Sequence, residues 1–146
     1  TAEIKNYDAL NFPENEKFDI VLLDAPCSAI GTIRKNPDII FRKKAPNLNS
    51  LYNLQERLLK KAALLLNSNG VIVYMVCSFF FNETLLPIKK FLKKNKEFSI
   101  LKYNNIKNQK DINSLITKEG YFLTAPGMYK NFNIDGFFSI QLIKND

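Results

Sequence analysis

Two cysteines are the residues of this chain best suited to covalent chemistry, and each follows a short apolar run. Cys27 stands three residues after Asp24 and directly after Pro26, and Cys77 directly follows the run at residues 71–76. A thiolate is a nucleophile that can split one difficult reaction step into two easier ones. The chain contains no histidine and no CxxC pattern. These absences argue against a zinc site, a Cys–His hydrolase and a redox dithiol enzyme.

Both thiols are expected just beyond the carboxyl ends of neighbouring strands. Residues 20–23 are four branched apolar residues in a row, which predicts a central parallel strand buried on both faces. Pro26 cannot donate a ladder hydrogen bond and fixes the turn after it. The run at residues 71–76 predicts a second strand, and the helical pattern between the two has the length of a βαβ unit. Neighbouring strands lie ~4.8 Å apart, so both thiols should open onto one crevice.

The remaining elements are predicted from periodicity and from turn residues. An apolar stripe predicts a helix over residues 47–67 that is capped by Asn49 or Ser50, and a second helix over 82–95 that begins near Thr84. Strands are expected at residues 1–7, 98–103, 120–124 and 137–143, with a turn at 125–127 and loops at 27–46 and 104–118.

Four motifs in order resemble one enzyme family. They are DAPCSAIG at residues 24–31, RKNPD at 34–38, VYMVCS at 73–78 and DGFF at 135–138. Together they look like the RsmB (Sun/Fmu) family of RNA 5-methylcytosine methyltransferases. The resemblance implies an α/β fold, namely the C-terminal half of a Rossmann-like domain with a mixed sheet and flanking helices. That family's glycine-rich loop for S-adenosylmethionine (SAM) is not found here, so residues 1–146 are expected to be a partial catalytic domain with little SAM affinity of its own.

The resemblance also implies roles for four site residues. Cys77 matches the nucleophile that adds to carbon 6 of cytosine, and Cys27 matches the cysteine that helps to release the methylated product. Asp24 is expected against SAM and the target base, and Asp8 matches the acidic residue that contacts the SAM adenosine. From the residues alone, Asp24 could equally cap the strand end and Asp8 could be an ordinary loop residue. Val76 replaces the threonine that usually precedes the nucleophile.

The substrate RNA is expected to lie along the loop after Cys27. Pro26, Arg34 and Lys35 are the candidate contacts, because a cation there could hold an RNA phosphate near the flipped base. Arg34 could instead be a surface charge or pair with Asp38. Gly136 is expected to allow a tight start to the last strand. Weaker phosphate candidates follow along the same loop, at Arg42, Lys43 and Lys44.

Composition permits an RNA partner without requiring one. The chain has 146 residues, 21 basic and 14 acidic, and a formal charge of +7, which suits nucleic-acid binding but also fits a lysine-rich solvated surface. No membrane span, signal peptide or metal site is predicted, so a cytoplasmic protein of undetermined oligomeric state is expected. We therefore predict SAM-dependent methylation of carbon 5 of a cytosine in RNA, with small-subunit ribosomal RNA as the expected target. The alternative is a non-catalytic RNA-binding module of the same fold.

Overall fold

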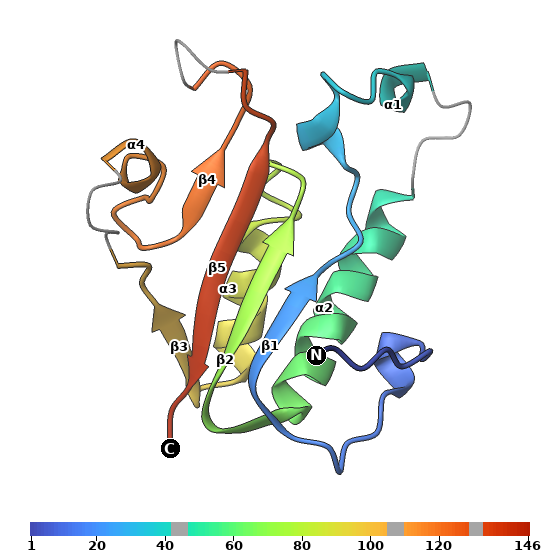
Figure 1. Ribbon diagram of the computed structural model, residues 1–146, viewed down its shortest axis with the longest axis vertical. Helices are drawn as coiled ribbons and strands as arrows, with labels where there is room; N and C mark the ends of the chain where they lie inside the picture. The colour runs from blue at the N-terminus through green and yellow to red at the C-terminus, as the bar shows by residue number, and fades with distance from the viewer. Residues whose placement is uncertain (42–46, 105–109, 129–132) are drawn as a thin grey trace.

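A five-stranded mixed sheet with two long helices forms the centre of the computed structural model (Figure 1). The structure describes residues 1–41, 47–104, 110–128 and 133–146. Its elements in chain order are η1 (Ala9–Asn11), β1 (Phe18–Asp24), η2 (Ile30–Thr32), α1 (Asp38–Phe41), α2 (Leu48–Leu64), β2 (Leu66–Val76), α3 (Leu85–Lys94), β3 (Phe98–Leu101), α4 (Lys110–Asn113), β4 (Phe122–Thr124) and β5 (Phe137–Lys144).

The sheet combines one parallel pair with three antiparallel pairs. β1 runs parallel to β2, as predicted, and β2 pairs with the antiparallel β5. The other edge of β5 is shared, because its first half pairs with β4 and its second half with β3. The carboxyl ends of β1 and β2 therefore lie side by side at one end of the sheet, and the two cysteines follow there.

The hydrophobic core lies between one face of this sheet and the helices α2 and α3 (Figure 1). Alternate residues of β2 point into it, and Ile72, Tyr74 and Val76 are fully buried. Helix α2 contributes Leu59, and α3 contributes Ile88. Because the period of β2 is two residues and that of the helices is 3.6, each element offers one apolar face to the same core.

Helix α2 ends three residues earlier than the sequence predicts. Its cap is Asn47, whose side chain accepts a hydrogen bond from the amide of Ser50 at 3.1 Å, rather than Asn49 or Ser50. The helix stops at Leu64 because the following residues join the sheet, with Leu66 pairing with Phe18 across a register shift. Strand pairing thus takes residues that the helical pattern alone would have assigned to α2.

Strand β1 lies at the edge of the sheet within the described residues, not at its centre. The prediction that it is buried on both faces is wrong here, because Ile20 and Leu22 are 65% and 63% exposed. Both residues point away from α2 and α3, whereas Val21 and Leu23 pack against the core. Only one of the two apolar faces of β1 is therefore covered.

Three predicted loops and strands also differ from the structure. Residues 1–7 are not a strand, since they form no ladder with β1 and Lys5 pairs instead with Glu16. The loop after Cys27 contains the short helices η2 and α1, and the loop at 104–118 contains α4. The remaining predictions are confirmed: α3 begins after Thr84, a turn follows β4 at 125–127, and β3, β4 and β5 lie within a few residues of their predicted bounds.

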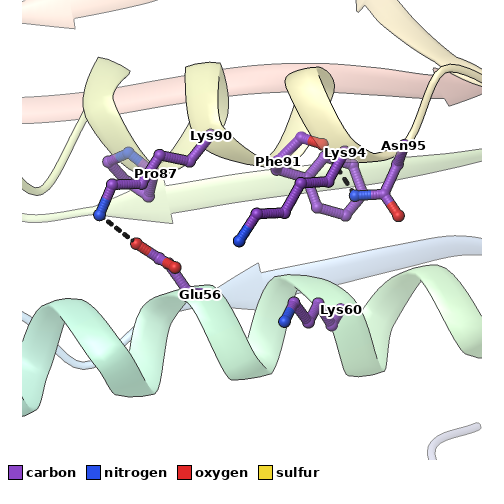
Figure 2. A pocket seen from close by; sticks show the side chains of 7 residues that line it. All are labelled: Glu56, Lys60, Pro87, Lys90, Phe91, Lys94 and Asn95. Atoms are coloured by element: carbon purple, nitrogen blue, oxygen red, sulfur yellow. Dashed lines mark hydrogen bonds and ion pairs between the residues drawn. The ribbon is translucent and has the colours of Figure 1, made fainter.

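The helices α2 and α3 pack closely beside each other (Figure 2). Lys90 on α3 forms an ion pair with Glu56 on α2, and the cavity beside them has a volume of only about 10 Å³. A cavity of that size has room for about one water molecule at most. Within the described ranges, no helix is both long and apolar enough to cross a membrane.

Candidate active site

The two cysteine side chains meet at the carboxyl ends of β1 and β2. Cys27 Sγ and Cys77 Sγ lie 3.2 Å apart, as free thiols at hydrogen-bond distance, and both residues are partly buried. The pairing of the strands continues one residue past β1, because the amide of Ala25 donates to the carbonyl of Met75 at 2.9 Å. The expectation that the strand ends bring both thiols to the same place is confirmed.

The loop after Cys27 returns to the end of β2 through two glycines. The amide of Gly31 donates to the carbonyl of Cys77 at 3.0 Å, and the amide of Gly136 donates to the carbonyl of Gly31 at 2.7 Å. A Cβ atom on Gly31 would lie 2.0 Å from the carbonyl oxygen of Gly136, and one on Gly136 would lie 2.4 Å from the ring of Phe79. Only glycine fits at either position. The two backbone hydrogen bonds join three of the four sequence motifs to one another.

A buried carboxylate lies behind the thiols. Glu83 is fully buried and accepts hydrogen bonds from the amide of Ser28 at 2.7 Å and from the hydroxyls of Ser28 and Ser78, each at 2.6 Å. Sequence reasoning missed this residue. The available signal was the serine after each cysteine, because two buried hydroxyls near one another call for a shared acceptor.

A second buried side chain supports the turn before Cys27. Gln55 on α2 is fully buried, and its Nε2 donates to the carbonyl of Pro26 at 2.9 Å. Sequence reasoning did not single out this residue. The structure shows that it fixes the proline turn to the helix. Pro26 itself is exposed.

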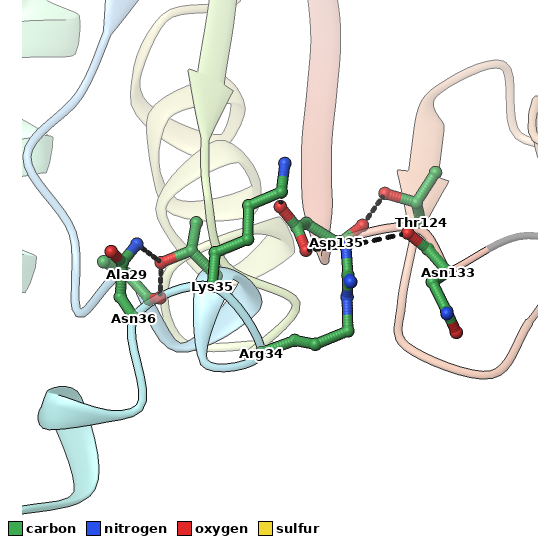
Figure 3. Close-up of polar contacts among 8 residues, drawn as sticks. Ala29, Arg34, Lys35, Asn36, Thr124, Asn133 and Asp135 are labelled. Atoms are coloured by element: carbon green, nitrogen blue, oxygen red, sulfur yellow. Dashed lines mark hydrogen bonds and ion pairs between the residues drawn. The ribbon is translucent and has the colours of Figure 1, made fainter.

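The two predicted RNA-binding cations are joined to the last motif (Figure 3). Arg34 Nη2 donates to the carbonyl of Asn133 at 2.9 Å and contacts Asp135 Oδ1 at 3.4 Å. Lys35 Nζ lies 2.8 Å from the other carboxylate oxygen of Asp135. The hydrogen bond from Lys35 holds the pKa of the Asp135 carboxyl below its usual range. The internal partner of Arg34 is therefore Asp135, and not Asp38 as one alternative predicted.

The microenvironment of the thiols favours a protonated Cys27. Burial, and then the hydrogen bond with Cys77, raises the pKa of the Cys27 thiol to about 12. The pKa of the nearby Tyr74 hydroxyl is also raised, mainly by burial, and that hydroxyl donates to the backbone carbonyl of Glu83 at 2.8 Å. Cys27 therefore keeps its proton at neutral pH, and a thiolate at Cys77 would accept that proton in a hydrogen bond.

The two predicted cofactor-binding carboxylates lie at different ends of β1. Asp24 is exposed at the carboxyl end, and the described part of the chain offers its side chain no hydrogen bond or ion pair. The structure therefore gives no support for Asp24 as a strand-end cap. Asp8 caps η1 by accepting from the amide of Leu10 at 2.9 Å. Phe12, at the end of η1, packs on Phe18 at the start of β1, so Asp8 is not brought to the thiols.

Three of the weaker candidates cannot be placed. Arg42, Lys43 and Lys44 lie outside the described residues. Among the residues that the structure does describe, no group of three or more histidine, cysteine, aspartate or glutamate side chains could hold a metal ion.

Comparison with known proteins shows the family of this chain. The family model described as 16S rRNA methyltransferase RsmB/F matches residues 1–143. This chain belongs to that family. It is 33% identical to ribosomal RNA small subunit methyltransferase B of Shewanella oneidensis, over 98% of this chain and 32% of that protein. It is 43% identical to the protein of the same name from Xylella fastidiosa strain 9a5c, over 54% of this chain and 19% of that protein.

Solved structures confirm that the fold is a fragment of the Rossmann-like methyltransferase domain. NSun6 from Pyrococcus horikoshii, solved with SFG, superposes with a TM-score of 0.75 at 22% identity and covers 99% of this chain and 35% of that one. A methyltransferase homologue from Pyrococcus horikoshii superposes with a TM-score of 0.68 at 26% identity, over 94% of this chain and 43% of that one. The RsmB/F chain described here spans a third or less of the length of the Shewanella oneidensis and Xylella fastidiosa proteins.

Proposed function

We propose that the protein containing this chain methylates carbon 5 of a cytosine in RNA, with small-subunit ribosomal RNA as its target. The observation that supports this proposal best is the pair of thiols 3.2 Å apart at the ends of two parallel strands. Membership of the RsmB/F family supports RNA methylation in general. The covalent step at cytosine is proposed from the two thiols.

Cys77 acts as the nucleophile and Cys27 as the residue that aids release. Carbon 5 of cytosine is a poor nucleophile, and the Cys77 thiolate makes it electron-rich by forming a bond to carbon 6. After carbon 5 has taken the methyl group, its proton leaves to a base, the bond from Cys77 to carbon 6 breaks, and the ring double bond returns. Cys27, which keeps its proton at neutral pH, is the group that hydrogen-bonds to the departing Cys77 thiolate.

The proposed methyl donor is SAM, which supplies a methyl group on a positively charged sulfur. Asp24 fits such a cofactor, because its carboxylate is exposed at the carboxyl end of β1, three residues before Cys27. Asp8 fits less well in this structure, because its carboxylate caps η1 near the start of β1. We keep both residues as proposed cofactor contacts. Support also comes from the structural neighbour that was solved with SFG, a SAM analogue.

Arg34, Lys35 and Pro26 are the proposed contacts to RNA. The Arg34 and Lys35 side chains are 43% and 65% exposed, and both flank the last motif beside the loop that carries Cys27. Each forms an ion pair with Asp135, and an RNA phosphate would compete with that carboxylate for the same cations. Surface ion pairs of this kind contribute little stability, so exchange of the carboxylate for a phosphate costs little.

A gel assay on the full-length protein tests the proposal. The parent, Cys77→Ala and Cys27→Ala forms are incubated with SAM and target RNA, and covalent protein–RNA bands are sought under denaturing conditions. A band should accumulate in Cys27→Ala, where release is slowed, and should be absent from Cys77→Ala.

Two results would contradict the proposal. A band that persists in Cys77→Ala would remove Cys77 as the nucleophile. No band in any form, together with no methyl group transferred by the parent, would favour the non-catalytic RNA-binding module.

A further inference from the structure

The fully buried Glu83 carboxylate is not balanced by a cation within the part of the chain that the structure describes. No lysine or arginine among the described residues forms an ion pair with it. Burying an unpaired carboxylate costs several kcal/mol unless hydrogen bonds satisfy it. Here three short hydrogen bonds do so, from the Ser28 amide, the Ser28 hydroxyl and the Ser78 hydroxyl.

The donors are the residues that directly follow the two cysteines. Ser28 succeeds Cys27 and Ser78 succeeds Cys77, so one carboxylate binds both chain segments that carry a thiol. The carboxylate is itself fixed, because the hydroxyl of the buried Tyr74 donates to the Glu83 backbone carbonyl at 2.8 Å. The core strand β2 thus anchors Glu83, and Glu83 anchors the two cysteine-bearing turns.

We propose that Glu83 is a positioning residue for both thiols, acting through Ser28 and Ser78 to set the separation of Cys27 Sγ and Cys77 Sγ. This inference rests on the proposed function only for its catalytic consequence. The positioning itself can be measured without RNA or SAM. Charge-assisted hydrogen bonds donated to a buried carboxylate are stronger and more directional than neutral ones, which suits a group that must hold two turns in register.

The charge of Glu83 has a second effect on the same pair. It contributes to the raised pKa of Cys27, after the larger effects of burial and of Cys77. Neutralising the carboxylate should therefore move the ionisation of Cys27 to lower pH. A residue that only filled space in the core would leave that ionisation where it is.

The test measures how readily the thiols of the full-length protein form a disulfide in a glutathione buffer. Two thiols and one oxidised glutathione give one protein disulfide and two reduced glutathiones, so the equilibrium reports the effective concentration of one thiol at the other. Glu83→Gln should lower that concentration at least ~tenfold, a shift of about 30 mV in midpoint potential. Ser28→Ala with Ser78→Ala should lower it in the same direction.

Ser139→Ala is the matched control. Ser139 is also buried and its hydroxyl bonds to that of Tyr103 at 2.6 Å, but it contacts neither serine nor Glu83. It should leave the thiol equilibrium within about twofold of the parent while losing a hydrogen bond of similar kind. The pH profile of Cys27 alkylation, read by mass spectrometry, should move to lower pH in Glu83→Gln and stay unchanged in Ser139→Ala.

The outcomes separate this proposal from the proposed function. If Glu83→Gln and the double serine variant both keep the parental equilibrium, Glu83 does not position the thiols. If Glu83→Gln does not fold, the serine double variant decides, since it keeps the carboxylate and the Ser28 amide. If the thiol equilibrium shifts as expected but the parent transfers no methyl group to RNA, the positioning role stands and the proposed function fails.

Discussion

At the level of single residues, the two cysteines are chemically unequal although they touch. Burial, followed by the hydrogen bond with Cys77, raises the pKa of Cys27 to about 12. An unfolded thiol ionises near pH 9, so the folded chain binds this proton more tightly than the unfolded chain does. The raised pKa therefore contributes fully to the free energy of unfolding below about pH 9, and this contribution is lost as the pH rises toward 12.

The inequality predicts slow alkylation of Cys27 in the folded protein. At pH 8.5 iodoacetamide should modify Cys27 at least ~tenfold more slowly than it does in urea-denatured protein, because only the thiolate reacts. The rate should keep rising beyond pH 10, whereas a thiol with a pKa near 9 reaches its maximal rate at about that pH. Mass spectrometry of the peptide that contains Cys27 measures both rates.

The Cys77→Ala variant provides the comparison for that prediction. It removes the second cause of the raised pKa, so Cys27 should react faster than in the parent at the same pH. A parental profile that is half-maximal near pH 9 would show that Cys27 is as ionisable as a free thiol.

At the level of elements, close backbone packing joins the loop after Cys27 to the start of β5. Gly31 and Gly136 approach so closely that no side chain fits between them. The same two residues carry the hydrogen bonds that tie the loop to Cys77 and to β5. The loop that carries Cys27 is thus fixed by elements far away in the sequence, although its described residues form only the short helices η2 and α1.

Gly31→Ala should therefore destabilise the fold and the site together. The added Cβ would meet backbone atoms of Gly136 and Cys77, which cannot move as a flexible side chain can. Overpacking of this kind costs about 1–3 kcal/mol, and we expect the upper part of that range in urea unfolding. Methyl transfer by the full-length protein should fall with it.

Ala29→Gly is the neighbouring control for this prediction. Ala29 has φ of 59° and ψ of 18°, a left-handed conformation that glycine adopts more readily than alanine. Its stability should stay within about 1 kcal/mol of the parent, because relieved strain offsets the added chain entropy. Equal stability of Gly31→Ala and the parent would contradict the proposed close packing.

At the level of the whole molecule, two pairs of positive charges lie at different ends of the sheet. Arg34 and Lys35 lie at the end of the sheet that carries the thiols. Lys93 and Lys94 lie in the last turn of α3, which runs back from that end (Figure 1). A formal charge of +7 does not say which of these cations meet RNA phosphates. The positions of these cations do distinguish them, because a base that reaches the thiols brings its own phosphates close to Arg34 and Lys35.

Salt dependence of RNA binding separates the two groups. Arg34→Ala in the full-length protein should lower the slope of log K against log salt by ~0.7–1, the loss of about one phosphate contact. The double variant Lys93→Ala with Lys94→Ala should leave the slope unchanged. Filter binding across a salt series measures both, and a smaller slope in the lysine variant alone would place the RNA on α3.

The amino-acid sequence by itself determined the local features of this protein. Short stretches of the sequence predicted the apolar strands β1 and β2, the apolar stripe of α2 and the turn at Pro26. Together these features placed the two thiols at the ends of adjacent strands. The motifs at Cys27, Arg34, Cys77 and residues 135–138 also carried the family resemblance, since family motifs are local patterns.

Only the tertiary structure decided how those motifs contact one another. The link from Asp135 to Arg34, the contact of Gly31 with Gly136 and the bridge from Glu83 to both serines join residues 5 to 105 positions apart in the chain. The early end of α2 and the exposed edge of β1 follow from strand pairing, which depends on partners elsewhere in the chain. Propensity and periodicity report short-range preferences, whereas a shared acceptor or a missing neighbour strand exists only after the chain has folded.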